Sequence, residues 1–518
     1  MELSRRSLLG LGAAGLGLAA LGIPNIGRSA PRESKRAPKN IIYLVADGMA
    51  LSVPTMADVY QQRVMGKKGY WMDLIEDPEV VTGVQDTRSL SSLVTDSAAS
   101  AAAWGSGVYQ WNGQINMLPD KTVLEPIGRL MKKIGMKVGL VTTTTITHAT
   151  PSGFAISIFD REWQDQIAAQ HLEHGMDILM GGGNAFFAAD KRKDKRDLYS
   201  EFQAKGYEVL RDRTSLEAAK GGKLLGIFND SHLPYTVDRD NSFKIKRSTP
   251  TLAEMTKVAI EKLKGSPQGF LLQVEGGRVD HGGHANDLAA AVFDQIAFED
   301  AVKVVMDFAR EDGETLVVIT SDHACGGPAL NGAGNEYFDA TAGLESLKDM
   351  KSSYGPILTK LGLAPTPNRV QDVVEDSLGL NLTSPEAQGI VDGLAGKSPF
   401  KLSSLHNSAG MTVAMILGNH THVKWTSGNH TNDHVLLSAY GPGSHHFQGM
   451  TRNVDVYSIL TGLRGITHKN PSMDYEKALP LMMQPAAFVN GACCADECPF
   501  AEYEARQILA ESHAGHSH

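Results

Sequence analysis

Five short apolar segments, separated by helix-like ones, constrain the fold of this 518-residue chain more than any other feature. Each is almost continuously apolar, which is typical of a strand that is buried on both faces. Helical patterns such as Leu252 to Leu263 and Leu288 to Phe308 lie between them. Buried strands that alternate with helices predict an α/β fold with a large, mostly parallel central sheet sandwiched by helices. The five segments are 40–46, 137–143, 269–274, 315–320 and 435–440.

The composition is that of an ordinary globular enzyme, with 42% hydrophobic and 21% charged residues. Lysine and arginine number 49 against 58 aspartates and glutamates, so the formal net charge is −9. A nucleic-acid partner needs a basic surface, which this balance does not supply. We therefore expect small-molecule partners and no nucleic acid.

The N-terminus resembles an export signal. Arg5 and Arg6 form a twin-arginine pair, and an uncharged, glycine- and alanine-rich segment follows from Leu8 to Ile23. That segment is short and weakly apolar for a membrane span. We predict that residues 1–38 are a twin-arginine-type signal and linker, that the mature protein has no stable membrane span, and that it is periplasmic or secreted. An ordinary secretory signal or a lipid-facing anchor are the alternatives.

The rest of the chain, 39–518, is predicted to be one domain. Residues 324–429 contain no further candidate ligands at a strand end, and we interpret them as an insertion, either a lid or crown over the site or plain surface elaboration. The tail, 503–518, is predicted to be flexible. Three of the four cysteines cluster before it, so a local disulfide that uses Cys498 is expected in an oxidising compartment.

Ionisable side chains follow the predicted strands. Asp47 follows the first strand, the stretch 144–150 the second, Glu275 the third and 321–323 the fourth. In open α/β sheets the functional site lies beyond the carboxyl ends of the strands. Residues that are far apart in the sequence are therefore expected to meet at one edge of the sheet.

The strongest single stretch runs from Glu275 to His284 and reads EGGRVDHGGH. Asp280 and His284 are four residues apart, which places them on the same side of a helical turn. An aspartate and a histidine in this arrangement are suitable as two of the three ligands of a catalytic zinc. Taken one at a time, a salt bridge, a helix cap or a buried polar contact is the plainer interpretation. Further carboxylates and imidazoles at the same edge, however, would crowd like charges unless cations separate them.

A second stretch, Leu93 to Gly107, reads LVTDSAASAAAWGSG. Alanine favours helices, and Asp96 or Ser97 is suitable as the N-terminal cap of a helix here. By itself the stretch predicts no more than that.

Six motifs together and in this order resemble the alkaline phosphatase family, and two further segments, at Asp177 to Gly183 and Pro234 to Thr256, also look like family segments. The resemblance extends from Lys39 to Gly462. The motifs are Asp47-Gly-Met, Thr95-Asp-Ser-Ala-Ala-Ser, Ala149-Thr-Pro with Arg161, Glu275 to His284, Ser321-Asp-His, and His430-Thr.

The resemblance implies a nucleophile, an arginine that grips phosphate, two zinc ions and one magnesium ion. Ser97 matches the serine that takes the phosphoryl group, and Arg161 matches the arginine. The metal ligands it implies are Asp280, His284 and His430 for the first zinc, Asp47, Asp322 and His323 for the second, and Asp47, Thr150 and Glu275 for magnesium.

Two histidines depart from some members of the family. His148 and His281 stand where certain bacterial members carry an aspartate and a lysine. We expect His148 to act next to the third metal rather than on it, and zinc to compete with magnesium there. His281 either touches phosphate through water or packs. His420 competes with His430 as a ligand. Cys325 is interpreted as a buried, unreactive thiol, and a thiolate that acts as a soft extra ligand is the alternative.

The function that these observations predict is hydrolysis of phosphate monoesters through a phosphoserine, with release of inorganic phosphate. The resemblance also implies a homodimer. A phosphodiesterase or a sulfatase of the same superfamily is the alternative enzyme. An exported metal- or phosphate-binding protein without catalysis is the alternative outside enzymes.

Overall fold

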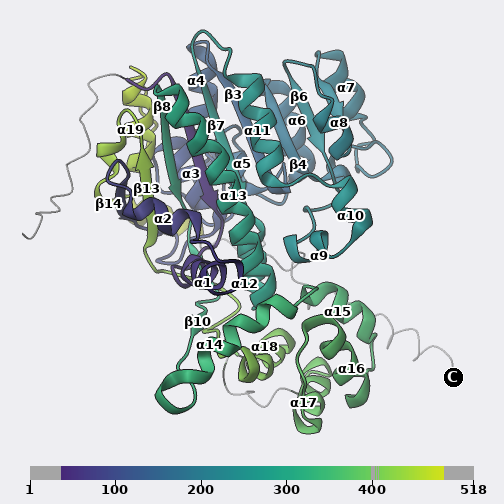
Figure 1. The fold of residues 1–518 in the computed structure, drawn as a ribbon. Coiled ribbons are helices and arrows are strands. Elements are labelled where there is room, and N and C mark those ends of the chain that lie inside the picture. The colour runs from purple at the N-terminus through teal and green to yellow at the C-terminus, as the bar shows by residue number, and fades with distance from the viewer. Residues whose placement is uncertain (1–36, 398–402, 404, 407, 483–518) are drawn as a thin grey trace, which may run out of the picture.

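The computed structural model describes residues 37–397, 403, 405–406 and 408–482 of the chain (Figure 1). Nearly all of the predicted signal, the predicted tail, and the cluster of three cysteines lie outside these residues. Among the helices within them, none combines the length and the apolar character that crossing a membrane requires.

A ten-stranded sheet forms the centre of the molecule, with the strand order β14-β2-β13-β8-β1-β7-β3-β4-β6-β5. The block from β8 to β5 is entirely parallel. The predicted fold class, a mostly parallel sheet between helices, is confirmed. The ten strands are β1 (Asn40–Ala46), β2 (Val81–Gln85), β3 (Lys137–Thr145), β4 (Ile178–Gly182), β5 (Glu208–Leu210), β6 (Leu224–Ile227), β7 (Phe270–Gly276), β8 (Thr315–Thr320), β13 (Val435–Tyr440) and β14 (Gly449–Thr451).

Helices fill the connections between the strands and form a separate group beside the sheet. In order along the chain they are α1 (Ser52–Tyr60), α2 (Tyr70–Glu76), α3 (Ser97–Ser106), α4 (Ile127–Lys133), α5 (Ala149–Gly153), α6 (Gln164–His174), α7 (Leu198–Ala204), α8 (Arg213–Glu217), α9 (Thr236–Asp240), α10 (Phe243–Ser248), α11 (Leu252–Leu263), α12 (Arg278–Ala285), α13 (Leu288–Asp312), α14 (Phe338–Glu345), α15 (Tyr354–Leu361), α16 (Pro367–Leu378), α17 (Ser384–Leu394), α18 (Ala409–Thr421), α19 (Asp455–Leu463) and α20 (Tyr475–Met482).

Strand β1 shows why the sheet is covered on both faces. Every one of its residues is buried. Ile42 and Leu44 join one apolar cluster, which includes side chains of α11 and α13, whereas Ile41, Tyr43 and Val45 join another, which includes side chains of α3 and α4. Successive side chains of a strand point to opposite faces, so a continuously apolar strand needs a helical layer on each side.

Strand β13 is the exception to the parallel arrangement, because it runs antiparallel to both of its neighbours, β8 and β2. Its amino-terminal end therefore lies at the same edge of the sheet as the carboxyl end of β8. The residues that precede β13 therefore lie at the same edge of the sheet as the residues that follow the parallel strands.

Residues 324–429, predicted as an insertion, contain the helices α14 to α18, which lie below the sheet in Figure 1. Two short antiparallel pairs hold the two ends of this segment together: β9 (Ala324–Cys325) with β12 (His430–Thr431), and β10 (Ala329–Leu330) with β11 (Val423–Lys424). The segment thus leaves the sheet and returns to it at nearly the same place.

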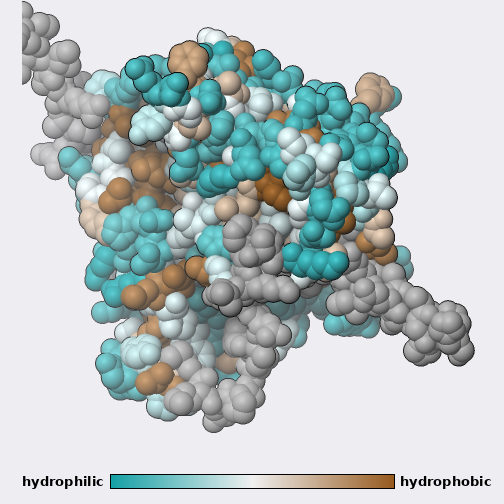
Figure 2. Space-filling view, turned by 90° about the horizontal axis from the view of Figure 1, so that it is seen from below, coloured by the Kyte–Doolittle hydropathy of each residue, from teal (hydrophilic) through white to brown (hydrophobic). Residues whose placement is uncertain are grey.

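The helices α14 to α18 contact the rest of the molecule through polar as well as apolar groups. The backbone N–H of Tyr354, at the start of α15, donates to Asp287 at 2.6 Å, and the backbone N–H of Ser353 donates to Asp238 at 2.8 Å. Seen from below, the surface is largely hydrophilic, with apolar side chains in separate patches (Figure 2).

Candidate active site

The carboxyl edge of the sheet gathers the predicted site residues from seven places in the chain. Asp47 follows β1 directly, Glu275 lies at the end of β7, Asp322 and His323 follow β8, and Asp280 and His284 lie on α12. His430 arrives from β12, Ser97 begins α3, and Thr150 lies in α5. All of them are buried or nearly so. The groups of potential ligand atoms that lie within 4.8 Å of one another are Asp280, His284, Cys325 and His430; Asp47, Asp322 and His323; and Asp47, His148 and Glu275.

Ser97 is the first residue of α3, and Asp96 caps the helix by accepting a hydrogen bond from the backbone N–H of Ala99 at 2.9 Å. The cap is therefore Asp96, which leaves the hydroxyl of Ser97 available for other contacts. Ser97 Oγ lies 3.1 Å from His323 Nε2. Unpaired amides and the helix dipole at this end favour an anion such as phosphate.

The alanine run after Ser97 has a packing reason. Every residue of α3 is buried. The helix approaches α5 so closely that a Cβ at Gly105 would lie 1.9 Å from the carbonyl oxygen of Gly153. A Cβ at Gly153 would likewise lie 2.7 Å from the Cβ of Ala101, so only small side chains allow the two helices to pack this closely.

The first group of ligand atoms is compact. His284 Nε2 lies 3.3 Å from Asp280 Oδ2 and 3.0 Å from His430 Nε2, which in turn lies 3.6 Å from Asp280 Oδ1. The Nδ1 atoms of both histidines lie 2.7 to 2.8 Å from backbone carbonyl oxygens. A carbonyl oxygen only accepts, so both Nδ1 atoms carry a proton, and both Nε2 atoms face Asp280 and each other. Although burial opposes it, Asp280 raises the pKa of His284 well above its ordinary value, so Nε2 of His284 holds a proton in the space that a metal ion would take.

The second group of ligand atoms lies directly beside the first. His323 Nε2 lies 3.1 Å from Asp322 Oδ2 and 3.6 Å from Asp47 Oδ1. Gly48 separates the two groups: its φ is +68°, and a Cβ there would lie 2.2 Å from Asp280 Oδ1. Only glycine allows the backbone after β1 to approach Asp280 this closely.

The third group is built around Glu275. Thr142 and Thr144 donate to Glu275 Oε2 at 2.5 Å and 3.2 Å. Thr150 donates to Asp47 Oδ2 at 3.4 Å. The Nδ1 of His148 lies 3.6 Å from Glu275 Oε1 and 3.9 Å from Asp47 Oδ2. Asp47 therefore stands between the second and third groups.

His148 also contacts Arg161. The guanidinium donates from Nη2 to His148 Nε2 at 2.8 Å, and its Nη1 lies 3.3 Å from Asp96 Oδ2. Because Arg161 can only donate, the neutral ring of His148 carries its proton on Nδ1, which faces the two carboxylates. In this geometry His148 offers Glu275 and Asp47 a proton rather than a lone pair.

The electrostatics of the site require positive charge. All of the site carboxylates have an exposed fraction of 0%. Burial raises the pKa of Asp47 well above its ordinary value, and the carboxylates of Asp322, Asp280 and Glu275 raise it further. Carboxylate oxygens that accept no hydrogen bond are Asp47 Oδ1, Asp280 Oδ1 and Oδ2, Asp322 Oδ2 and Glu275 Oε1.

Divalent cations fit these residues. Burial and the neighbouring His323 lower the pKa of His430 to about 3, so its imidazole is neutral, the form that binds a metal. Buried carboxylates without hydrogen bonds are costly unless a cation neutralises them. Oxygen and imidazole donors together are typical of zinc, and the group around Glu275 offers oxygen donors suitable for magnesium.

Two histidines of the sequence analysis can now be placed. His281 Nδ1 accepts from Arg278 at 2.5 Å, and its ring lies 5.9 Å from that of His148, centroid to centroid. His420 lies at the end of α18 and pairs with Glu386 at 3.2 Å. Of the two competing histidines, His430 is therefore the one among the site carboxylates.

Sequence reasoning missed His232. Its ring centroid lies 4.6 Å from that of His281 and 6.0 Å from that of His148, and its Nδ1 accepts from the backbone N–H of Thr145 at 3.0 Å. His232 follows β6, a strand that the sequence analysis did not recognise. Had that strand been recognised, the same rule that placed Asp47 and Asp322 would have found it.

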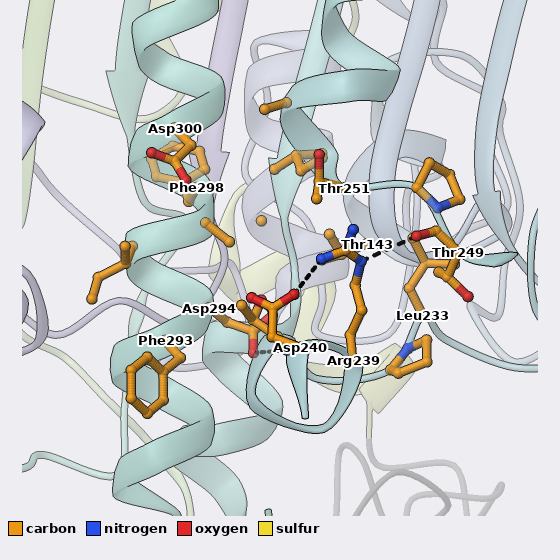
Figure 3. Close-up of a pocket in the computed structure, with 18 of the residues that line it drawn as sticks. Thr143, Leu233, Arg239, Asp240, Thr249, Thr251, Phe293, Asp294, Phe298 and Asp300 are labelled. Carbon is orange, nitrogen blue, oxygen red and sulfur yellow. Dashed lines mark hydrogen bonds and ion pairs between the residues drawn. The ribbon is translucent and has the colours of Figure 1, made fainter. Parts of the chain in front are cut away.

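A separate pocket of about 350 Å³ is lined in part by Thr143 and Gly276, which are next in sequence to Thr142 and Glu275 of the third group (Figure 3). Phe293, Asp294 and Phe298 of α13 form one wall, and Arg239 lies opposite, where it donates to the backbone carbonyl of Thr249 at 3.1 Å. Concave size alone would make it a candidate site. Its lining contains neither Ser97 nor any predicted ligand, so we assign the chemistry to the edge of the sheet.

Comparisons with known proteins agree with this assignment. A family model described as alkaline phosphatase matches residues 38–465. Alkaline phosphatase 3 of Bacillus subtilis is 32% identical over 427 residues, which are 81% of this chain and 87% of that protein. The crystal structure of Thermus thermophilus alkaline phosphatase superposes with a TM-score of 0.82 at 33% identity, over 90% of this chain and 99% of that one. A cold-active alkaline phosphatase from Shewanella sp. has a TM-score of 0.68 at 28% identity, over 82% and 99%.

Fold and site together define a phosphatase, an enzyme that removes phosphoryl groups from phosphate monoesters. The chain belongs to the alkaline phosphatase family, whose members depend on metals.

Proposed function

We propose that this protein hydrolyses phosphate monoesters through a phosphoserine on Ser97, with zinc held by Asp280, His284 and His430, a second zinc held by Asp47, Asp322 and His323, and magnesium held by Asp47, Thr150 and Glu275. The observation that carries the proposal is the gathering of buried carboxylate oxygens, which accept no hydrogen bond, around a serine at the start of a helix.

The bound cations would neutralise the phosphate and the carboxylates, lower the pKa of the attacking hydroxyl and stabilise the departing alkoxide. Ser97 Oγ would attack phosphorus in line with the ester oxygen, so that a serine O–P bond forms as the ester P–O bond breaks, with the hydroxyl proton released to water and a proton from water taken up by the departing alkoxide. Attack by water would then release inorganic phosphate and restore Ser97. The start of α3 holds the hydroxyl in place throughout.

Arg161 would bind the non-bridging oxygens of the phosphate with two parallel hydrogen bonds. Asp96 and His148 orient its guanidinium, at 3.3 Å and 2.8 Å. Asp96 is itself fixed by the backbone N–H groups of Ala99 and Gly113. The capping residue of α3 thus couples the position of the nucleophile to that of the arginine.

The experiment that tests the nucleophile is Ser97→Ala. We expect kcat on an aryl phosphate monoester to fall by at least about 10³-fold, because the residual rate comes only from binding and charge stabilisation. Labelled phosphate, trapped on the wild-type protein at acid pH, should be recovered on the peptide that contains Ser97.

Ser384→Ala is a matched control, because Ser384 is also the first residue of a helix, α17, but lies outside the site. It should leave kcat unchanged. Normal turnover in Ser97→Ala, or label on another residue, would contradict the proposed mechanism.

Export and assembly are proposals from the sequence and the family. We propose that the twin-arginine segment directs the protein to the periplasm or the medium, and that the mature protein is a homodimer. Replacing Arg5 and Arg6 by lysine should retain the precursor in the cell, and the mass of the purified protein by light scattering tests the dimer.

A further inference from the structure

Cys325 lies at the first group of ligands, although the mechanism above does not use it. It forms β9 with Ala324, and in the register of the β9–β12 pair it stands directly opposite His430. Opposite residues of an antiparallel pair present their side chains on the same face, with Cβ atoms about 4.5–5.5 Å apart. Its backbone N–H donates to the carbonyl of Gly48 at 2.9 Å, which fixes this strand next to Asp47.

The thiol is a buried free thiol with an exposed fraction of 1%. Its sulfur belongs to a group of ligand atoms, with those of Asp280, His284 and His430, that all lie within 4.8 Å of one another. Helix α12 makes room for it: a Cβ at Gly283 would lie 3.1 Å from Cys325 Sγ and 2.9 Å from its Cβ. The glycine before His284 thus lets the sulfur reach the same space as the imidazole.

A second observation shows that this space is built for a ligand. Both carboxylate oxygens of Asp280 are fully buried and accept no hydrogen bond. The Nε2 atoms of His284 and His430 face each other at 3.0 Å. Carboxylate oxygens and imidazole nitrogens converge there with the sulfur of Cys325 beside them.

We propose that Cys325 supplies a thiolate as a fourth protein ligand of the metal that Asp280, His284 and His430 hold. This inference rests on the proposed function, which assigns a metal to that group. As the metal–sulfur bond forms, the thiol proton leaves to solvent. A thiolate is a soft ligand, so the donor set selects zinc over magnesium or manganese. Zinc can expand to five ligands, which leaves a position for an oxygen of the substrate.

The test uses the full chain loaded with cobalt(II) in place of zinc. A thiolate ligand gives a sulfur-to-cobalt charge-transfer band in the near ultraviolet, whereas oxygen and nitrogen ligands do not. The triple variant Cys493→Ser, Cys494→Ser, Cys498→Ser keeps Cys325 as the only cysteine and is expected to retain the band in full. Cys325→Ser, with the other three cysteines intact, is expected to lose it.

A second measurement is competition with a chelator for zinc. Cys325→Ser is expected to hold the most weakly bound zinc at least about tenfold less tightly than the wild type, and the triple variant equally tightly. If the thiol only donated a hydrogen bond to Asp280, the serine hydroxyl of Cys325→Ser could replace it. Unchanged zinc affinity in Cys325→Ser, together with no sulfur-to-cobalt band in any variant, would therefore overturn the inference.

The outcomes separate this inference from the proposed function. Visible cobalt bands and phosphatase activity without a charge-transfer band in the triple variant would overturn the thiolate and leave the proposed function intact. Absence of cobalt binding and of metal-dependent activity would overturn both. Because the triple variant retains Cys325, the result does not depend on whether Cys325→Ser folds.

Discussion

The carboxyl edge of the sheet and the helices of residues 324–429 differ in what compensates their polar groups. At the edge, buried carboxylates of Asp47, Asp280 and Asp322 carry oxygens that accept no hydrogen bond. In the helical segment, polar groups serve their own backbone: Thr366 and Thr383 cap α16 and α17, and Ser408 caps α18. The first region depends on charge supplied from outside the chain, whereas these helix ends of the second are capped by neighbours in sequence.

The two regions also differ in how they are connected. Ligands at the edge come from strands and helices that are hundreds of residues apart, while the apolar positions Val370, Val373 and Val374 of α16 repeat within one helix. Disturbing the edge should therefore affect many elements at once, and disturbing one helix of the segment should affect mainly that helix.

Removal of metal has the largest expected effect. Chelation should abolish hydrolysis of an aryl phosphate and lower the stability of the protein by about 4 kcal/mol, the value for a ligand present at a thousand times its Kd. Amide hydrogen exchange should show lost protection at the ends of β1, β7 and β8, and retained protection in α16 and α17. Equal loss in both regions would show that the helical segment also depends on the metals, and restored zinc and magnesium should reverse the effect.

Arg161→Ala should have the next largest effect. We expect kcat/KM on a phosphate monoester to fall about 100-fold, or about 2.7 kcal/mol, because a two-pronged bond to phosphate is lost. Affinity for inorganic phosphate should fall with it, while the metal content stays unchanged. Arg192→Ala is not a suitable control because that arginine is buried, so exposed Arg369→Ala in α16 serves, and it should leave both values unchanged.

Asp294 on α13 is a buried carboxyl group outside the site, stabilised by hydrogen bonds and by the charge of Arg278 rather than by a cation. Burial raises its pKa to about 7, against an ordinary value near 3.9 in the unfolded chain, although Thr236 donates to it twice. Between about pH 4 and about pH 7 the folded state then binds more protons than the unfolded state, so this group makes stability fall as pH rises, by up to about 1.4 kcal/mol per pH unit.

Asp294→Asn should remove that contribution, and the free energy of unfolding, followed by urea titration at several pH values, should fall less steeply over this window. An unchanged slope would show that the two bonds from Thr236 and the charge of Arg278 are enough to keep the group ionised.

Thr383→Ala has the smallest expected effect. The variant loses the capping box that Thr383 forms with Glu386 at the start of α17. Unfolding should require about 1 kcal/mol less, with kcat and metal content unchanged. A change in kcat would mean that the helical segment and the edge of the sheet are coupled more closely than their contacts indicate.

The positions of several site residues could be predicted from the sequence by simple rules. Asp280 and His284 lie on one helical turn, so their spacing alone placed them side by side. Asp47 and Asp322 follow parallel strands, whose carboxyl ends share one edge. His430 escapes this rule, because it precedes the antiparallel strand β13 and returns to the edge through the β9–β12 pair. Its place came from the resemblance to the family. The roles of these residues stay predictions.

Other parts could not be predicted. The sequence analysis expected Cys325 to be an unreactive thiol, and its place beside Asp280 depends on a two-residue strand and on the room that Gly283 leaves. His232 depends on β6, a four-residue strand that is too short to show a period. The contact of His148 with Arg161 depends on a loop and on ring orientation.

By itself the sequence determined the layered fold of this protein, the core strands and the family. Apolar periodicity and motif spacing are local properties, so they are visible along the chain without the structure. Tertiary structure alone decided which polar atoms face each other. Distances of 3 to 4 Å between Asp280, His284 and His430 depend on strand direction, on register and on glycines that permit close approach. Such contacts are fixed only when the whole sheet has formed.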